Sequence, residues 1–272
     1  MFPRLKFPEL DRDLSRTPAD AEAIYFQGDI ALPGVISTFR NAKRVRVLGC
    51  SQEGLGAICA LRNVEYMLMW KWIRVSDLSP MVSLVSLRGL AVEHAPGLQS
   101  VSPLRDIESL RLLELVDANQ IPEQVAACAE ITQLTGLSLG GSPFGSVRFE
   151  PSLEPLAALA DLQHLGLNVK PRDESLEPIA WLRGLRSLVI RPDMASSTEY
   201  ARLAKTLRGV VECGQLRPYA EARYARCKKC GAARMVKPTG KRMRKQCLDC
   251  DQAAILRLTD AWYSAEPFAR GE

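Results

Sequence analysis

The chain has 272 residues, of which 47% are hydrophobic, 25% charged and 6% aromatic. This composition is typical of a soluble globular protein with a mainly aliphatic core, and it excludes disordered and collagen-like chains. No stretch approaches the roughly 20 consecutive apolar residues that span a bilayer, and the first residues lack the apolar run of a signal peptide. We therefore expect a cytoplasmic protein that does not contact a membrane.

Charge and cysteine content divide the sequence unevenly. Residues 217–272 hold 13 Lys or Arg against 6 Asp or Glu, although the whole protein carries a net charge of only +5, so the preceding residues are net negative. Four of the eight cysteines form two close pairs in this basic end, and four are scattered singly. That distribution favours a metal site in a reducing compartment over a secreted disulfide framework.

A periodic pattern fills most of the sequence. LEPLAALADLQHLGL from Leu153 and LEPIAWLRGLRSLVI from Leu176 align without a gap at an offset of 23 residues. The same frame fits segments that begin at Leu55, Leu78, Val101 and Val125. The expected strand-opening residues recur every 22 to 28 positions, at Val45, Met67, Leu90, Leu113, Leu137, Leu165, Leu188 and Val210.

Each unit of this pattern predicts one turn of a solenoid. The alternating Leu-x-Leu segment predicts a short strand with its leucines inward, and the preceding period-3 run predicts a helical or 3₁₀ return. One unit cannot bury its apolar face alone, so neighbouring units must stack. The fold class that we predict is an α/β solenoid of about eight units followed by a small four-cysteine module.

The pattern resembles the leucine-rich repeat family, particularly its short bacterial and internalin-like repeats with a Pro-Leu opening, which Pro80, Pro103, Pro155 and Pro178 match. The sequence departs from the family after each strand, where an asparagine ladder is usual. Those positions hold Cys50, Trp72, Ala95, Ala118, Ser142, Lys170 and Asp193. The resemblance implies a concave sheet used for recognition, and these buried turns must satisfy their backbone groups without asparagine.

The ends of the array need covers. We assign residues 1–40 to an N-terminal cap segment in which Ala23–Phe26 forms a strand, and residues 41–213 to the solenoid. Ser196 and Glu199 have capping-box spacing and predict a helix that Gly209 ends. The spacing of 28 residues places an extra segment near residues 140–145, which is either a contact loop or a tolerated insertion.

The strand register predicts which side chains point out of the concave face. In the first units these are unusually apolar and aromatic for a free surface, which favours a protein contact. The alternative is that Tyr66 and Trp70 lie under the N-terminal segment and extend the core. The candidate partner-binding residues are Arg46, Tyr66, Leu68, Trp70, Glu93, Leu112 and Glu114. The later units present small side chains that suggest a shallow shelf.

No catalytic pattern stands out. His94 and His164 are the only histidines, no phosphate-binding glycine loop precedes a helix, and no nucleophile lies at a characteristic spacing. We therefore expect a protein that is not an enzyme.

The paired cysteines predict a metal site. Cys227 and Cys230 are followed after sixteen residues by Cys247 and Cys250, within the spacing of structural zinc sites. Four thiolates on two tight turns surround one Zn²⁺ and leave no open position for chemistry. Redox dithiols and a RING-type module with eight ligands are the less favoured alternatives. Residues 234–237 and 241–246 read as two strands joined by a turn, so residues 224–272 resemble a zinc ribbon with a final helix, joined by a linker at 214–223.

This C-terminal segment is also strongly basic. Between Arg223 and Gln246 there are ten Lys or Arg and no acid, more than four thiolates around one Zn²⁺ require. The pattern indicates contact with a nucleic-acid backbone, with an acidic protein partner or a solubilising surface as alternatives. The candidate nucleic-acid-binding residues are Lys228, Lys229, Arg234, Lys237, Lys241, Arg242, Arg244 and Lys245. A non-catalytic interaction protein remains the leading prediction, and a nucleic-acid-binding factor is its rival.

Overall fold

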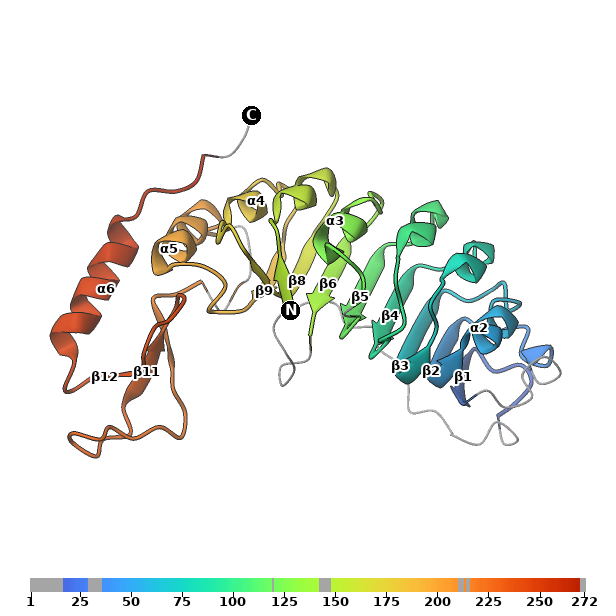
Figure 1. Cartoon of the computed structure of the whole chain (residues 1–272), viewed down its shortest axis with the longest axis horizontal. Helices are drawn as coiled ribbons and strands as arrows, with labels where there is room; N and C mark the ends of the chain where they lie inside the picture. Colours follow the sequence, from blue (N-terminus) through green and yellow to red (C-terminus); the bar gives the residue numbers. More distant parts are fainter. Residues whose placement is uncertain are drawn as a thin grey trace.

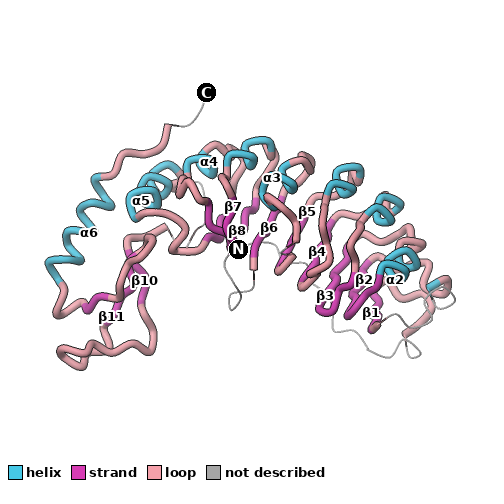
Figure 2. The backbone as a smooth tube through the Cα atoms, viewed as in Figure 1, coloured by secondary structure: helices cyan, strands magenta, loops and turns pink. Residues whose placement is uncertain are grey.

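The computed structural model describes residues 17–28, 36–118, 120–141, 148–209, 213 and 216–269, apart from the side chain at position 72. Its strands stack side by side into a curved array, with the strands on the inner side and the helical returns on the outer side (Figures 1 and 2). The sequence order of the strands is also their spatial order, except that β7 lies beside the far end of β8. The predicted solenoid is therefore present.

All strands of this sheet pair in parallel. Each of the first seven expected strand-opening residues lies within a strand, and Val210 is outside the described residues. The strands are β1 (Ala23–Gln27), β2 (Arg44–Ser51), β3 (Tyr66–Arg74), β4 (Gly89–Glu93), β5 (Leu112–Val116), β6 (Gly136–Gly140), β7 (Arg148–Glu150), β8 (His164–Pro171) and β9 (Ser187–Ile190).

The returns between strands are short helices, as the period-3 runs predict. Pro80, Pro103, Pro155 and Pro178 each occupy the first turn of a return, where proline's missing N–H costs nothing. The returns are α2 (Gln52–Ile58), α3 (Gln124–Ala129), α4 (Glu177–Ala180) and 3₁₀ helices at Ser79–Ser83, Ser102–Asp106 and Glu154–Ala158.

The core lies between the two layers. In β5, Leu113 and Leu115 are fully buried and alternate with the half-buried residues Leu112, Glu114 and Val116. Leu110 and Leu104 on the return side are equally buried. Every unit repeats this arrangement, so the apolar core is continuous along the solenoid.

Backbone hydrogen bonds replace an asparagine ladder after the strands. Gly28, His94 and Asp117 directly follow β1, β4 and β5, whereas Gly49 and Lys71 lie in the second halves of β2 and β3. All five have left-handed φ angles between 52° and 73°. After β1, β4 and β5, the N–H group of the turn reaches the next unit: Gly28 donates to Leu48 over 2.7 Å, His94 to Val116 over 2.8 Å and Asp117 to Gly140 over 3.1 Å. The unusual residues at the ladder positions are thus compatible with satisfied turns.

The extra segment between β6 and β8 contains β7. The predicted contact loop or insertion at residues 140–145 falls mostly within residues 142–147, which lie outside the described residues. Glu150 at the end of β7 is fully buried and links this strand to α3. Its carboxylate accepts hydrogen bonds from Arg148 at 2.5 Å and from the N–H of Val125 at 3.2 Å.

The solenoid ends at α5 (Ser197–Thr206). Ser196 caps this helix by accepting a hydrogen bond from the N–H of Glu199, as the capping box predicts. The second half of the box is absent, because the Glu199 carboxylate accepts from the N–H of Leu176 in the preceding unit instead. Gly209 follows the helix with a φ of +74°.

The remaining residues form a C-terminal module (residues 216–269) against the last units (Figure 1). Its sheet contains β10 (Tyr219–Glu221), β11 (Met235–Pro238) and β12 (Gln246–Cys247), paired antiparallel, and α6 (Gln252–Ser264) follows. Two details differ from the expectations drawn from the sequence. Residues 219–221, assigned to the linker, form a strand, and the second predicted strand, 241–246, is mostly a loop because it turns toward the solenoid.

Candidate functional site

The four paired cysteines come together in the C-terminal module. The sulfurs of Cys227, Cys230, Cys247 and Cys250 all lie within 4.8 Å of one another, and none is in a disulfide. The sulfurs of Cys227 and Cys250 are 3.9 Å apart, and those of Cys230 and Cys247 are 3.7 Å apart. Four sulfurs held tetrahedrally about 2.3 Å from one ion would be about 3.8 Å apart, so the cluster fits a single four-coordinate metal ion.

The two knuckles that carry these sulfurs close differently. After Cys230, Gly231 adopts a φ of +74° and donates its N–H to the carbonyl of Cys227 over 2.9 Å. Asp251 takes the equivalent place after Cys250. Its N–H donates to the carbonyl of Cys247 over 2.9 Å, and its carboxylate accepts from the N–H of Cys247 over 2.8 Å. The second knuckle therefore has an additional hydrogen bond from a side chain, which the first lacks.

Asp251 also joins the two knuckles. Its carboxylate lies 3.2 Å from Nζ of Lys229, which belongs to the first knuckle. The N–H of Cys247 and the Lys229 ammonium together lower the pKa of Asp251. The carboxylate thus stays ionised at neutral pH and holds the two turns against each other.

The sulfurs differ in acidity. The pKa of Cys227 falls to about 7 because N–H groups of Cys230 and Lys229 point at its sulfur. The pKa of Cys250 rises to about 12 beside the sulfur of Cys230. A bound cation would displace the protons from all four thiols, so metal affinity must depend on pH.

The candidate nucleic-acid-binding residues have unequal surroundings. Lys229 and Arg234 pair with Asp251 and Asp249, and Lys241 pairs with Glu174 of the solenoid. The others are exposed, and none has a carboxylate partner among the described residues. These five are Lys228, Lys237, Arg242, Arg244 and Lys245.

The candidate partner-binding residues all lie on the inner face of β2–β5. Arg46, Leu68 and Glu114 fall on one line across the strands, with Ala91 between the last two. Tyr66 and Leu112 flank Gly89 on a second line. Trp70 and Glu93 are direct neighbours on a third line. All seven side chains are half-buried, so the fold brings them together on one surface.

Cations stack on the aromatic rings of this surface. The Arg46 guanidinium lies 4.9 Å from the ring centroid of Trp70 and 5.6 Å from that of Tyr25. Nζ of Lys71 lies 4.6 Å from Trp70, and Arg44 lies 5.6 Å from Tyr66. Reasoning from the sequence missed Tyr25 and Lys71. The pairing of β1 with β2, which places Tyr25 opposite Arg46, was the signal that could have found Tyr25.

The later strands carry a groove of about 520 Å³ on the same face. Ser138, Gly140 and Gly166 supply its small side chains, which matches the expected shelf, and Glu114 lines it as well. Arg191 borders the groove and donates hydrogen bonds to Asn168 at 2.7 Å and to Asp193 at 3.0 Å.

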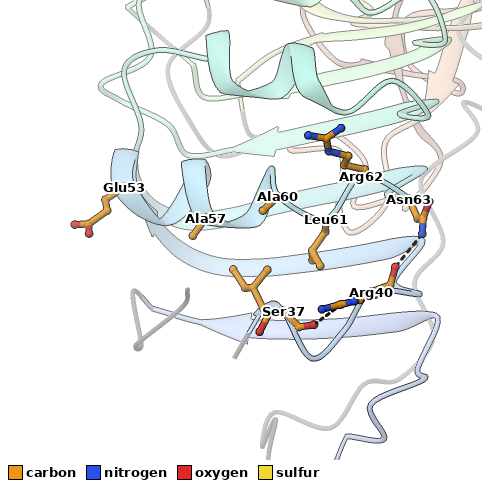
Figure 3. Close-up of a pocket in the computed structure, with 9 residues that line it drawn as sticks. Ser37, Arg40, Glu53, Ala57, Ala60, Leu61, Arg62 and Asn63 are labelled. Atoms are coloured by element: carbon orange, nitrogen blue, oxygen red, sulfur yellow. Dashed lines mark hydrogen bonds between the residues drawn. The ribbon is translucent and has the colours of Figure 1, made fainter. Parts of the chain in front are cut away.

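A second cavity of about 610 Å³ lies on the other layer of the fold, beside α2 (Figure 3). Ala57, Ala60 and Leu61 line it on the α2 side. Across from them, Arg40 donates to the carbonyl of Ser37 over 3.3 Å. None of the residues predicted from the sequence to bind a partner lines this cavity.

The two histidines lie in different surroundings. His94 lies in a turn, with Nδ1 3.0 Å from the Asp117 carboxylate. His164 is opposite Ser187 on β9, but neither His164 Nδ1 nor Ser187 Oγ makes a hydrogen bond. Among the described residues, no helix is long and apolar enough to span a bilayer.

The sequence matches no protein-family model, and no curated protein matches it. Several solved structures are similar to it at low sequence identity. An internalin from Listeria monocytogenes is 21% identical over 61% of this protein and 45% of its own length, with a TM-score of 0.44. Internalin C2 from the same organism is 19% identical over 65% of this protein and 74% of its own length, with a TM-score of 0.42.

A leucine-rich repeat protein from Leptospira interrogans is 16% identical over 70% of this protein and 53% of its own length, with a TM-score of 0.44. The match thus spans less than half of the first internalin. Since all three TM-scores are below 0.5, the solenoid assignment rests on the strand register of this protein itself.

Proposed function

We propose that this protein is a non-catalytic, cytoplasmic interaction protein that binds a partner protein on the concave face of its solenoid. One observation carries the proposal: Tyr66, Leu68 and Trp70 point out of the sheet side by side and are half-buried rather than sealed in the core. Tryptophan, tyrosine and arginine are the residues that most often dominate binding energy at protein interfaces. Arg46 completes this set beside Trp70.

The four-cysteine cluster has a structural part in this proposal. We assign it one Zn²⁺, held by Cys227, Cys230, Cys247 and Cys250, because four thiolates in a tetrahedral set suit zinc. With all four positions filled by protein, the ion would lack a site for substrate or water. Its role is then to order the two knuckles, and reduced thiols are consistent with the cytoplasm.

Affinity capture with matched variants tests the concave face. The tagged full-length protein, its Trp70→Ala variant and a Val85→Ala control are incubated with cell extract, and retained proteins are quantified by mass spectrometry. Val85 is an apolar residue that is 71% exposed in the turn before β4. We expect a partner that the wild type and Val85→Ala retain equally and that Trp70→Ala loses.

That partner is then purified and its affinity measured by calorimetry, with circular dichroism to verify that Trp70→Ala is folded. Truncating a central aromatic anchor typically weakens binding by 2 kcal/mol or more, about thirty-fold. Equal binding to all three proteins contradicts the proposal. It would then support the alternative that Tyr66 and Trp70 lie under the N-terminal segment, whose residues 1–16 are outside the described range.

A second candidate function, nucleic-acid binding by the C-terminal module, is favoured by its pattern of ion pairs. The acids on its sheet and knuckles are already paired: Glu221 with Arg223, Asp249 with Arg234 and Asp251 with Lys229. Of the five exposed cations without a carboxylate partner among the described residues, Lys237, Arg242, Arg244 and Lys245 lie on or beside the β11–β12 connection and are left to attract phosphates.

Fluorescence anisotropy of labelled DNA and RNA across a salt series tests this second candidate. If the module binds nucleic acid, affinity falls steeply with salt, and neutralising Lys237, Arg242, Arg244 and Lys245 to Gln removes it. The Trp70→Ala variant is the control and should bind as the wild type does. Absence of binding at low salt eliminates this function and leaves the protein partner.

A further inference from the structure

Arg46 is held by aromatic rings from both neighbouring strands. It lies in the middle of β2, directly opposite Tyr25 on β1, and its guanidinium is 5.6 Å from the Tyr25 ring and 4.9 Å from the Trp70 ring on β3. Tyr25 is only 4% exposed. Contacts with two rings restrict the position of the guanidinium between β1 and β3.

The N–H groups of Arg46 lack a carboxylate acceptor. Its Nε atom is buried and makes no hydrogen bond. Among the described residues, no carboxylate forms an ion pair with it. The acids of the inner face are remote, because Glu93 lies on β4 and Glu114 on β5, two and three strands away. At about 4.8 Å per strand, these acids are roughly 10 and 14 Å from the line of Arg46.

A half-buried guanidinium without an anionic partner is costly in the free protein and strongly prefers an anion when water is excluded. A single planar fork matches the two oxygens of a carboxylate. Leu48 and Leu68 beside it are apolar, and the nearest cations, Arg44 and Lys71, already lie against the rings of Tyr66 and Trp70.

We infer that Arg46 is the anchor for a carboxylate of the partner protein, presented beside apolar side chains. The carboxylate belongs either to an Asp or Glu side group or to a free C-terminus of the partner. It accepts hydrogen bonds from the guanidinium edge, while the neighbouring apolar groups pack on Leu68 and Trp70. This inference rests on the proposed function and specifies the chemistry of its partner.

Peptide selection tests the inference, followed by a double-mutant cycle that removes charge from the peptide and from Arg46. A display library of random twelve-residue peptides is selected on the full-length zinc-loaded protein, and peptides whose binding Trp70→Ala abolishes are synthesised. Each peptide is synthesised with its acidic residues intact and with Asn or Gln replacing them. Both versions are made with a free C-terminus and with an amidated C-terminus. Affinities are measured for the wild type, Arg46→Gln and Arg257→Gln, the last removing a charge on the exposed face of α6.

We expect the selected peptides to be enriched in acids next to apolar residues. One of the two peptide changes, replacement of its acids by Asn or Gln or amidation of its C-terminus, should weaken binding by about ten-fold or more. This loss should occur with the wild type and with Arg257→Gln. The same change should have little effect on Arg46→Gln, whose folding is verified by circular dichroism. Which of the two peptide changes has this effect identifies the source of the carboxylate.

Trp70-dependent peptides without an acid preference, or with a preference that Arg46→Gln leaves intact, would overturn this inference but leave the proposed function standing. A selection that yields no Trp70-dependent peptide counts against both. The two failures are therefore distinguishable in one experiment.

Discussion

The N–H of Gly240, at the tip of the β11–β12 connection, donates a 2.8 Å hydrogen bond to the carbonyl of Pro192 in the last solenoid unit. The next N–H, from Lys241, donates to Ala195 over 2.7 Å, and the Lys241 ammonium pairs with Glu174. Farther along, Phe268 is 3% exposed and donates its N–H to Thr206 of α5 over 2.9 Å. The C-terminal module thus caps the last unit of the solenoid.

Gly240→Ala should weaken the contact between this C-terminal cap and the solenoid. Gly240 has a φ of +127°, and a Cβ there would lie 2.8 Å from the backbone nitrogen of Ser197, so the added methyl group must displace the tip. We expect a loss of about 1–3 kcal/mol in unfolding free energy, with faster amide exchange in α5.

The matched control for this variant is Gly56→Ala in α2. A Cβ at Gly56 meets nothing within 4 Å, so this change should be neutral or stabilise the helix by up to about 1 kcal/mol. Chemical denaturation of both variants compares them, and equal stability would show that the tip does not support the solenoid end.

Metal content should depend on each of the four clustered cysteines. The purified protein is expected to bind one zinc ion, and Cys247→Ser, at a fully buried ligand, should lose it. Cys213→Ser, outside the cluster, should retain it. Atomic absorption gives the stoichiometry, and a metal-free wild type or full zinc content in Cys247→Ser would refute the assignment.

Removing the metal should also weaken the solenoid end, because the knuckles and the tip belong to one small sheet. Chelation is expected to lower the melting temperature and to increase amide exchange in the C-terminal module and α5, while β3–β5 remain protected. Uniform loosening along the whole protein would instead indicate one cooperative unit.

The central leucines should be the main source of stability. Leu113 is fully buried in β5, so Leu113→Ala should cost about 2–5 kcal/mol. Leu256, 63% exposed on α6, is the control, and its replacement by alanine should change stability by less than about 0.5 kcal/mol. Urea denaturation measures both, and similar values would be inconsistent with the layered core.

Stability should fall as the pH drops through the range in which histidine titrates. Burial lowers the pKa of His164 below its ordinary value of 6.5, so the folded state resists protonation while the unfolded state accepts a proton. The contribution of His164 to stability is therefore fully present above pH 6.5 and is lost as the pH falls below that value. His164→Gln should melt with a weaker dependence on pH between 7 and 5, and an unchanged dependence would contradict this reasoning.

Much of this architecture could be predicted because it is periodic. Residues such as Leu113 and Leu165 recur at nearly constant spacing, and each satisfies the same local requirement for an inward apolar side chain at alternate strand positions. The zinc-type spacing of Cys227–Cys250 is local in the same sense. These predictions needed no knowledge of tertiary contacts.

The parts that escaped prediction depend on contacts between distant segments. Asp251 takes the place that Gly231 has in the first knuckle, and its role appears only when its carboxylate accepts a hydrogen bond from the N–H of Cys247. Lys241 is one of ten basic residues in its segment, and only the docking of the tip places it beside Glu174. Tyr25 reaches Arg46 through the pairing of β1 with β2, which periodicity alone does not specify.

The most direct test of the central claim is carbene footprinting of the protein, free and bound to the partner recovered by affinity capture. We predict reduced labelling of Tyr66, Leu68, Trp70 and Leu112 in the complex, with the exposed Val85 and the cations of the C-terminal module unchanged. Protection confined to Lys237, Arg242, Arg244 and Lys245, with the concave face labelled as in the free protein, would contradict it.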